Sequence, residues 1–62
     1  MKTTLMSMNG GTKEVCYGDP VRNTVTGERC RFIRQDGNWI ELMDNDGKTM
    51  GDLWHVSQIK AI

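Results

Sequence analysis

The sequence of 62 residues contains little from which a reaction centre could be built. It has one histidine, His55, and two cysteines, Cys16 and Cys30, with no Cys-x-x-Cys pair. A zinc site takes three or four such ligands, and a catalytic thiol needs a neighbouring base. We therefore expect no metal site, no cofactor, no small-molecule substrate and no enzymatic activity.

Excess charge of one sign and long apolar runs are also missing. Eight Lys and Arg residues balance eight Asp and Glu residues, which removes the non-specific attraction to phosphate of a strongly basic domain. No stretch approaches the ~18 apolar residues of a membrane span, and the first residues lack the apolar run of a signal peptide. We expect a cytoplasmic protein without membrane contact, whose two cysteines are reduced.

The balanced charges are nevertheless distributed unevenly along the chain. The basic side chains of residues 19–34 are Arg22, Arg29, Arg31 and Arg34. The acidic side chains of residues 35–52 are Asp36, Glu41, Asp44, Asp46 and Asp52, against the single cation Lys48. The domain is therefore dipolar along its sequence.

Turn signals indicate the fold class. Residues 18–20, 26–27, 36–37 and 46–47 combine Gly with Asp, Pro or Thr about every ten residues, a spacing typical of small antiparallel β proteins. The segments between them, 21–25, 28–34, 38–43 and 48–54, carry β-branched and aromatic residues. We expect one all-β domain over residues 13–62. Residues 1–12, which show no clear period, are expected to form a flexible arm or a weak first strand.

The two Asp-Gly turns suggest a strand register. Each fits a three-residue loop with its glycine in the left-handed region, at residues 35–37 and 45–47. The first loop predicts the pairs Ile33–Trp39, Phe32–Ile40, Arg31–Glu41 and Cys30–Leu42. The second loop predicts the pairs Met43–Thr49, Leu42–Met50 and Trp39–Leu53. A two-residue loop at residues 36–37 is rejected because it mixes charged and apolar residues on both faces.

This register divides the side chains between two faces. The predicted core face consists of Cys30, Phe32, Ile40, Leu42 and Met50. The opposite face holds an apolar row, Ile33, Trp39 and Leu53, beside Arg31 and Glu41. Three explanations for the row stay open: the N-terminal arm covers it, it is the inner side of a strongly bent strand, or it is a contact surface.

Several short motifs resemble the small SH3-like barrels of the KOW and Tudor type. They are Gly18-Asp19-Pro20-Val21-Arg22, Val25-Thr26-Gly27-Glu28, Asp46-Gly47-Lys48 and the closing segment 56–62, in which residues 57–59 suit one turn of 3₁₀ helix. The resemblance implies a barrel of about five antiparallel strands over residues 15–62. Such barrels bind RNA, DNA, peptides or other subunits. Cys30 stands where KOW motifs commonly carry a glycine, which weakens the inference of nucleic-acid binding.

The first functional hypothesis is a binding module that contacts a protein partner or its own copy. Its patch is centred on Trp39, with Ile33 and Leu53 beside it and Arg31 and Arg34 at the rim. Exposed tryptophan and arginine are enriched at binding hot spots. A short, Met-rich chain of this kind suits a small regulatory or accessory protein of a bacterium or phage.

The alternative hypothesis is a regulator that binds RNA or single-stranded DNA. Arginines near an aromatic ring can neutralise phosphates while unpaired bases stack on the ring. The residues in question are Arg22, Arg29, Arg31, Arg34 and Tyr17.

Overall fold

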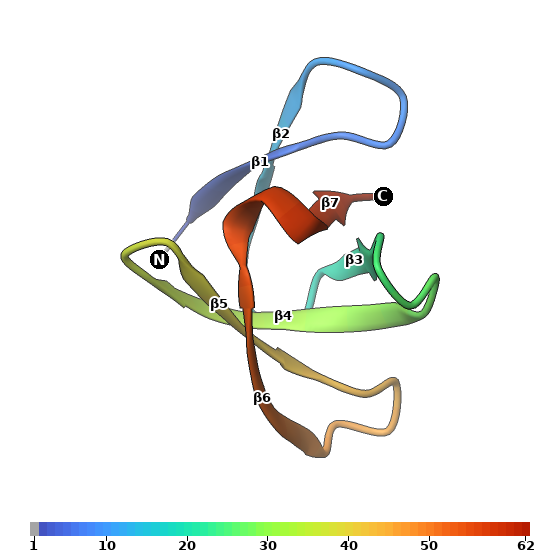
Figure 1. Ribbon diagram of the computed structural model, residues 1–62, viewed down its shortest axis with the longest axis vertical. Helices are drawn as coiled ribbons and strands as arrows, with labels where there is room; N and C mark the ends of the chain where they lie inside the picture. Colours follow the sequence, from blue (N-terminus) through green and yellow to red (C-terminus); the bar gives the residue numbers. More distant parts are fainter. Residues whose placement is uncertain (1) are drawn as a thin grey trace.

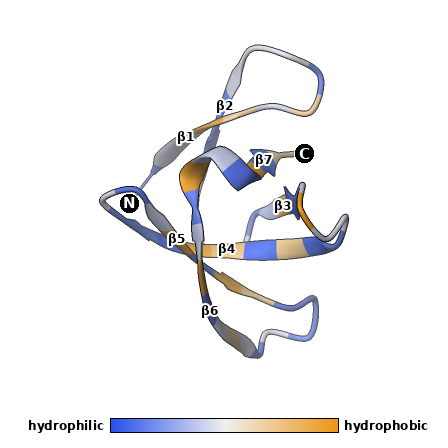
Figure 2. Cartoon of the chain, in the orientation of Figure 1, coloured by the Kyte–Doolittle hydropathy of each residue, from blue (hydrophilic) through white to orange (hydrophobic). Residues whose placement is uncertain are grey.

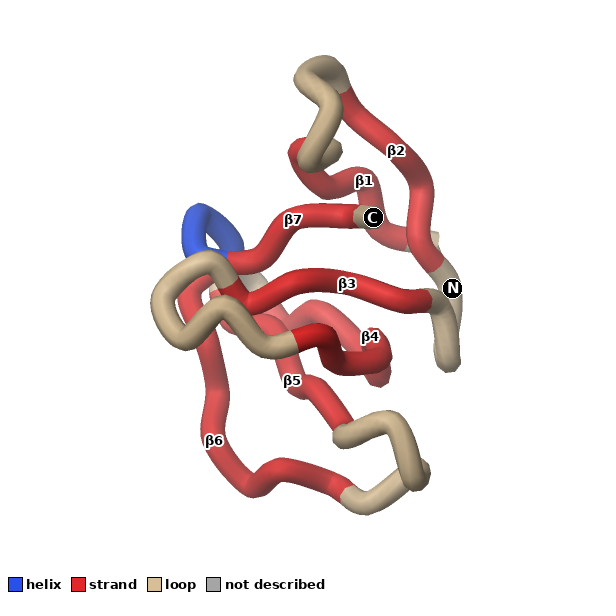
Figure 3. Tube along the Cα trace, turned by 90° about the vertical axis from the view of Figure 1, so that its right-hand side faces the viewer, coloured by secondary structure: helices blue, strands red, loops and turns tan. Residues whose placement is uncertain are grey.

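The computed structural model describes residues 2–62, and this part of the chain is all-β, as predicted. Figures 1 and 3 show strands joined by short turns. The elements are β1 (Thr3–Met6), β2 (Thr12–Val15), β3 (Pro20–Asn23), β4 (Arg29–Asp36), β5 (Trp39–Met43), β6 (Thr49–His55), a 3₁₀ turn η1 (Val56–Gln58) and β7 (Ile59–Ala61). No helix in residues 2–62 has the length and apolar character needed to cross a bilayer.

The strands form two antiparallel sheets. β1 pairs with β2, and the second sheet has the order β6-β5-β4-β3-β7. Figure 3 shows β7 between β3 and the N-terminal hairpin. A parallel bridge joins Ser7 to Ala61, and the Met8 N–H donates to the Ala61 carbonyl at 2.9 Å. The strands do not close into a barrel, because β6 pairs only with β5.

The N-terminal hairpin contributes to the core. Leu5 on β1 is 2% exposed and Val15 on β2 is 1% exposed. Residues 1–12 were expected to form a flexible arm or a weak first strand, and the structure has a strand over Thr3–Met6. The expected boundary at residue 13 falls inside β2. Met1 lies outside the described residues. Only one side chain of β1 is buried, so the sequence showed no apolar alternation there.

The core lies between the two sheets. Its fully buried side chains are Leu5, Val15, Val21, Cys30, Phe32, Ile40, Leu42, Ile59 and Ala61. Four of the five predicted core residues are therefore confirmed, and the fifth, Met50, is partly buried against the same cluster. Figure 2 shows that the chain is more hydrophilic at the β5–β6 turn than along β5.

The first hairpin does not have the predicted register. Asp36 pairs with Trp39, so the loop holds only two residues, Gly37 and Asn38. Gly37 has φ 61°, the positive angle that the first central position of a type II′ turn requires. A bulge between Phe32 and Arg34 absorbs the extra residue. The bulge keeps the apolar side chains on one face. It thereby avoids the mixing of charged and apolar residues for which a two-residue loop at residues 36–37 was rejected.

The second hairpin follows the prediction at its turn and departs from it further along. Met43 pairs with Thr49 as predicted. A second irregularity then shifts the register by two residues, so that Glu41 pairs with Leu53 and Trp39 pairs with His55. The predicted Trp39–Leu53 pair is therefore wrong. A shift of two preserves the faces, because side chains alternate with a period of two.

Candidate functional site

Trp39 is the first residue of β5, the strand between β4 and β6, and lies on the outer face of these three strands. Directly paired residues in antiparallel strands point to the same side. The two cross-strand rows are Asp36–Trp39–His55 and Arg34–Glu41–Leu53, which together we call the Trp39 face. Trp39 is 49% exposed and Leu53 is 54% exposed. The Trp39 and His55 rings meet edge to face, with centroids 5.7 Å apart.

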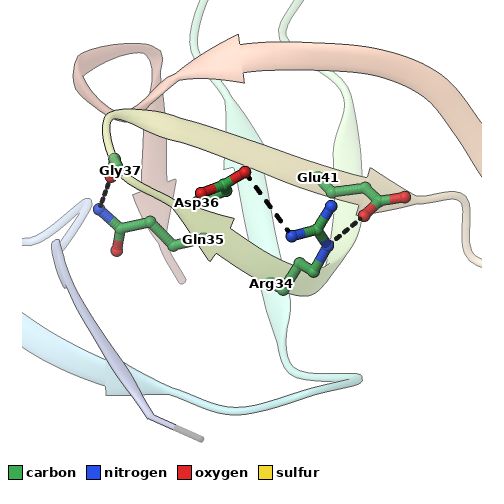
Figure 4. Close-up of polar contacts among 5 residues, drawn as sticks. All are labelled: Arg34, Gln35, Asp36, Gly37 and Glu41. Carbon is green, nitrogen blue, oxygen red and sulfur yellow. Dashed lines mark hydrogen bonds and ion pairs between the residues drawn. The ribbon is translucent and has the colours of Figure 1, made fainter.

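Arg34 forms ion pairs within the Trp39 face. Its Nε donates to Glu41 Oε1 at 2.8 Å, and its Nη1 lies 3.9 Å from Asp36 Oδ2 (Figure 4). The predicted Arg31–Glu41 pair is therefore wrong, since Arg34 stands opposite Glu41. The guanidinium is neutralised by two carboxylates of its own hairpin, which makes it a poor cation for an external phosphate.

His55 also has a partner within the chain. It is the N-cap of η1: its Nδ1 accepts from the Ser57 N–H at 3.2 Å, and Gln58 Oε1 accepts from the His55 N–H at 3.0 Å. This capping box holds the turn that leads from β6 into β7.

Two members of the predicted patch lie elsewhere. Ile33 falls in the β4 bulge and lines a groove together with Tyr17 and Phe32. Arg31 pairs with Met43, and its Nη1 donates to the Gly18 carbonyl at 2.9 Å. The structure therefore keeps Trp39, Leu53 and Arg34 in the Trp39 face, whereas Arg31 lies one row further along the same side of the sheet, opposite Met43, and Ile33 lies in the bulge. The turn at Gly37 and Asn38 is the cause, because counting back from it places Arg34 opposite Glu41, and the bulge that follows leaves Ile33 without a direct partner.

The basic side chains predicted for nucleic-acid binding gather on the outer face of β7, β3 and β4. Lys60 lies directly opposite Arg22, and Arg22 lies directly opposite Arg29. Arg31 follows Arg29 on the same side of β4, two residues along. We call Lys60, Arg22, Arg29 and Arg31 the basic row. With strands ~4.8 Å apart and ~3.3 Å per residue, the row extends about 10 Å across the sheet and about 7 Å along β4.

No acidic side chain neutralises the basic row. Within residues 2–62, no carboxylate oxygen lies within 4.0 Å of its nitrogen atoms. The recorded partners are main-chain carbonyls: Arg22 Nη1 donates to Gly27 at 2.8 Å and Arg31 Nη1 to Gly18 at 2.9 Å. Like charges directly opposite each other in a sheet are destabilising. The row is thus a concentration of uncompensated positive charge on a chain of zero net charge.

Sequence reasoning missed Lys60. It is separated from Arg22 by most of the chain, and only the β3–β7 pairing brings the two together. The local signal was present in Ile59-Lys60-Ala61, where Lys60 alternates with two buried residues and must point outward. The sequence did not reveal that this strand pairs with β3.

Two grooves lie along β4. One, of about 410 Å³, is lined by Pro20, Arg29, Arg31 and Asn45. The other, the Tyr17 groove, has a volume of about 470 Å³ and is lined by Lys2, Thr3, Tyr17, Phe32, Ile33, Arg34, Gln35 and Gly37. Tyr17 is 70% exposed, and the Gln35 amide donates to the Gly37 carbonyl at 2.7 Å (Figure 4). Tyr17 and Arg34 therefore share a groove, whereas Arg22, Arg29 and Arg31 share the neighbouring face.

An acidic turn borders the basic row on the β5 side. Asp44 Oδ1 accepts from the N–H groups of Asp46 and Lys48, both at 2.9 Å, which closes the turn between β5 and β6. Asn45 of the same turn donates to the Arg29 carbonyl at 3.4 Å. The carboxylates of this turn repel anions, so a polyanion on the basic row would extend away from β5 and β6.

The cysteines occupy different environments. Cys16 is exposed and Cys30 is buried, and both are free thiols. Burial raises the pKa of the Cys30 thiol above its ordinary value, and the negative charges of Glu28 and Asp44 raise it further. Residues 2–62 contain no group of three His, Cys, Asp or Glu side chains arranged to hold a metal ion.

No family model, no curated protein and no solved structure matches this chain.

Proposed function

We propose that the chain is a non-enzymatic binding module that holds single-stranded nucleic acid, RNA or DNA, on the basic row. The observation that carries the proposal is the direct opposition of Lys60, Arg22 and Arg29 on three adjacent strands. Such an arrangement costs folding free energy unless an anion neutralises it. A phosphate backbone supplies a line of such anions, and cations that contact it release its counterions.

The strand order supports a relationship to SH3-like barrels of the KOW and Tudor type. The order β6-β5-β4-β3-β7 is a meander whose last strand returns to the first, and a 3₁₀ turn precedes that last strand. The proposed nucleic-acid surface is the outer face of the sheet where first and last strands meet. An open sheet with an N-terminal hairpin beside β7 distinguishes this chain from a simple five-stranded barrel.

Salt-dependent binding tests this function. Fluorescence anisotropy of short labelled oligo(dT) and oligo(U) is measured between about 50 and 200 mM salt. If all four cations of the basic row contact phosphates, log Kd changes with log salt with a slope of about 2.8, since each contact contributes ~0.7 on a single strand.

Charge removal provides the matched comparison. The double variant R22Q/R29Q should reduce the slope to about 1.4, because two phosphate contacts are lost. The control K48Q removes one positive charge from the acidic turn and should bind as the wild type does. Absence of binding at the lowest salt, or an equal loss in K48Q, would reject the proposed function.

The Trp39 face supports a second function, contact with a protein partner or with the chain's own copy. Trp39 and Leu53 are about half exposed on adjacent strands, and the N-terminal hairpin packs beside β7 at the other end of the sheet. The paired charges of Arg34, Glu41 and Asp36 would form a polar rim around the apolar centre. The Trp39 face and the basic row share no residue, so the two functions have separate tests.

A further inference from the structure

We infer that the Tyr17 groove receives an unpaired base of the strand that lies on the basic row. The inference rests on the proposed function and specifies it further: the ligand must offer a splayed base as well as phosphates. It also assigns Tyr17 as the stacking platform and Ile33 as the apolar wall.

The groove and the basic row adjoin through one short segment, residues 17–20. Tyr17 lines the groove, and the next residue, Gly18, accepts the hydrogen bond from Arg31 Nη1 at 2.9 Å. The same segment is fixed to β4, since Gly18 N–H donates to the Phe32 carbonyl at 2.8 Å and Phe32 N–H to the Asp19 carbonyl at 2.9 Å. Arg31, the last cation of the row, is therefore hydrogen-bonded to the residue that follows Tyr17 in the sequence.

The composition of the groove suits a base. Its volume of about 470 Å³ lies within the range of small-ligand sites, ~300–1,000 Å³. Tyr17 has 70% of its surface exposed, so a planar group can reach its ring. The half-buried Ile33 lines the same groove, and Lys2 and Gln35 supply polar groups. Base stacking on an aromatic ring tolerates any sequence, because every base has a π face.

Charge sets the direction in which the nucleic-acid strand crosses the sheet. The acidic turn beside Arg29 disfavours a path over β5 and β6. A nucleic-acid strand that leaves the basic row at Arg31, on the side away from β5, meets Tyr17. A base paired in a duplex cannot enter the groove, so the inference predicts that the contribution of Tyr17 is confined to single strands.

The experiment compares Tyr17→Ala and Tyr17→Phe with the wild type, using short oligo(dT), oligo(U) and a DNA duplex. Y17A should weaken single-strand binding about 5-fold or more, the lower limit expected for one stacked base, without changing the salt slope. Y17F should bind as the wild type does. Duplex binding should be equal in all three proteins. The control L53A removes a comparably exposed apolar side chain from the Trp39 face and should leave binding unchanged.

A second measurement is independent of affinity. An oligonucleotide that contains 5-bromouracil, bound to the wild type and irradiated, should crosslink to Tyr17. Mass spectrometry of the digested adduct locates the crosslinked residue. Salt-dependent binding that is lost in R22Q/R29Q but unchanged in Y17A, with crosslinks elsewhere, would overturn the Tyr17 groove and leave the proposed function standing. Absence of any single-strand binding would overturn both. The oligo(dT) and oligo(U) arms distinguish DNA from RNA as the source of the base.

Discussion

Arg22 and Arg29 stand directly opposite each other on β3 and β4, and Lys60 stands opposite Arg22 on its other side. Most cross-strand neighbours of charged residues are of opposite sign or uncharged, because opposed like charges lower stability by up to about 1 kcal/mol. Here the repulsion is uncompensated by carboxylates within residues 2–62. This uncompensated repulsion is the observation on which the proposed nucleic-acid site rests.

The first prediction concerns this repulsion. Lys60→Gln should raise the free energy of unfolding by a few tenths of a kcal/mol at low salt, because it relieves one like-charge contact. The gain should disappear at about 1 M salt, where the screening length falls to ~3 Å. Urea unfolding at both salt concentrations measures it. K48Q, a control in acidic surroundings, should give no gain, and a gain that persists at high salt would contradict the electrostatic explanation.

The second prediction concerns the β4–β5 turn. Gly37→Ala should destabilise the protein by about 1–2 kcal/mol, because a residue with a Cβ pays this cost in the left-handed region. Gly37 has φ 61°, and an added methyl group would meet no atom within 4 Å, so the cost is one of backbone conformation alone. The urea midpoint measures it. Asn38→Ala, at the other loop position with no positive φ, is the control and should cost clearly less.

The third prediction concerns the Trp39 face. Trp39→Ala should weaken self-association or partner binding while the fold persists, since half of the side chain is already exposed. Light scattering gives the solution mass, and circular dichroism checks the fold. L53A should weaken the same contact, whereas Y17A should not. A wild-type mass that is monomeric at all concentrations would eliminate self-association and leave only a different protein as the partner of this face.

The fourth prediction concerns the two thiols. Cys16 should react quickly with a thiol reagent and Cys30 only slowly, because Cys30 is 1% exposed and burial raises its pKa. Mass spectrometry of the native protein after brief labelling locates the modified residue. Equal labelling of both cysteines would show that the core opens readily.

The same pKa shift sets an alkaline limit on stability. The unfolded thiol ionises near pH ~8.5, whereas burial keeps the Cys30 thiol protonated to higher pH in the folded state. The unfolded state therefore binds fewer protons above this pH, and stability falls as pH rises from there through the folded pKa. Urea midpoints on either side of pH ~8.5 should show a decline that Cys30→Ala reduces and Cys16→Ala leaves unchanged.

Local sequence signals predicted the turns well. The glycines of the Asp-Gly and Thr-Gly pairs, Gly27, Gly37 and Gly47, all lie between strands and all have positive φ. The 3₁₀ turn occurs within one residue of its predicted place, at Val56–Gln58. These features depend on φ preferences and on hydrogen bonds between residues close in sequence, so a single sequence contains the information.

The composition of the faces was predicted only in part. The core residues Cys30, Phe32, Ile40 and Leu42 were identified because their spacing along each strand is local information. Ile33 was wrongly paired with Trp39, because it lies in a bulge and a bulge leaves no distinct sequence signal. Arg34, rather than Arg31, meets Glu41 because the turn is at Gly37 and Asn38 and not at residues 35–37.

The sequence by itself determined the all-β class, the positions of the turns and which side chains alternate toward the core, since each follows from local backbone preference and a period of two. The tertiary structure alone decided which strands distant in the sequence are neighbours. The pairing of β3 with β7 placed Lys60 beside Arg22, and the packing of residues 17–20 on β4 placed Tyr17 beside Arg31. Such neighbours are chosen by the global burial of apolar surface, which no local stretch of sequence encodes.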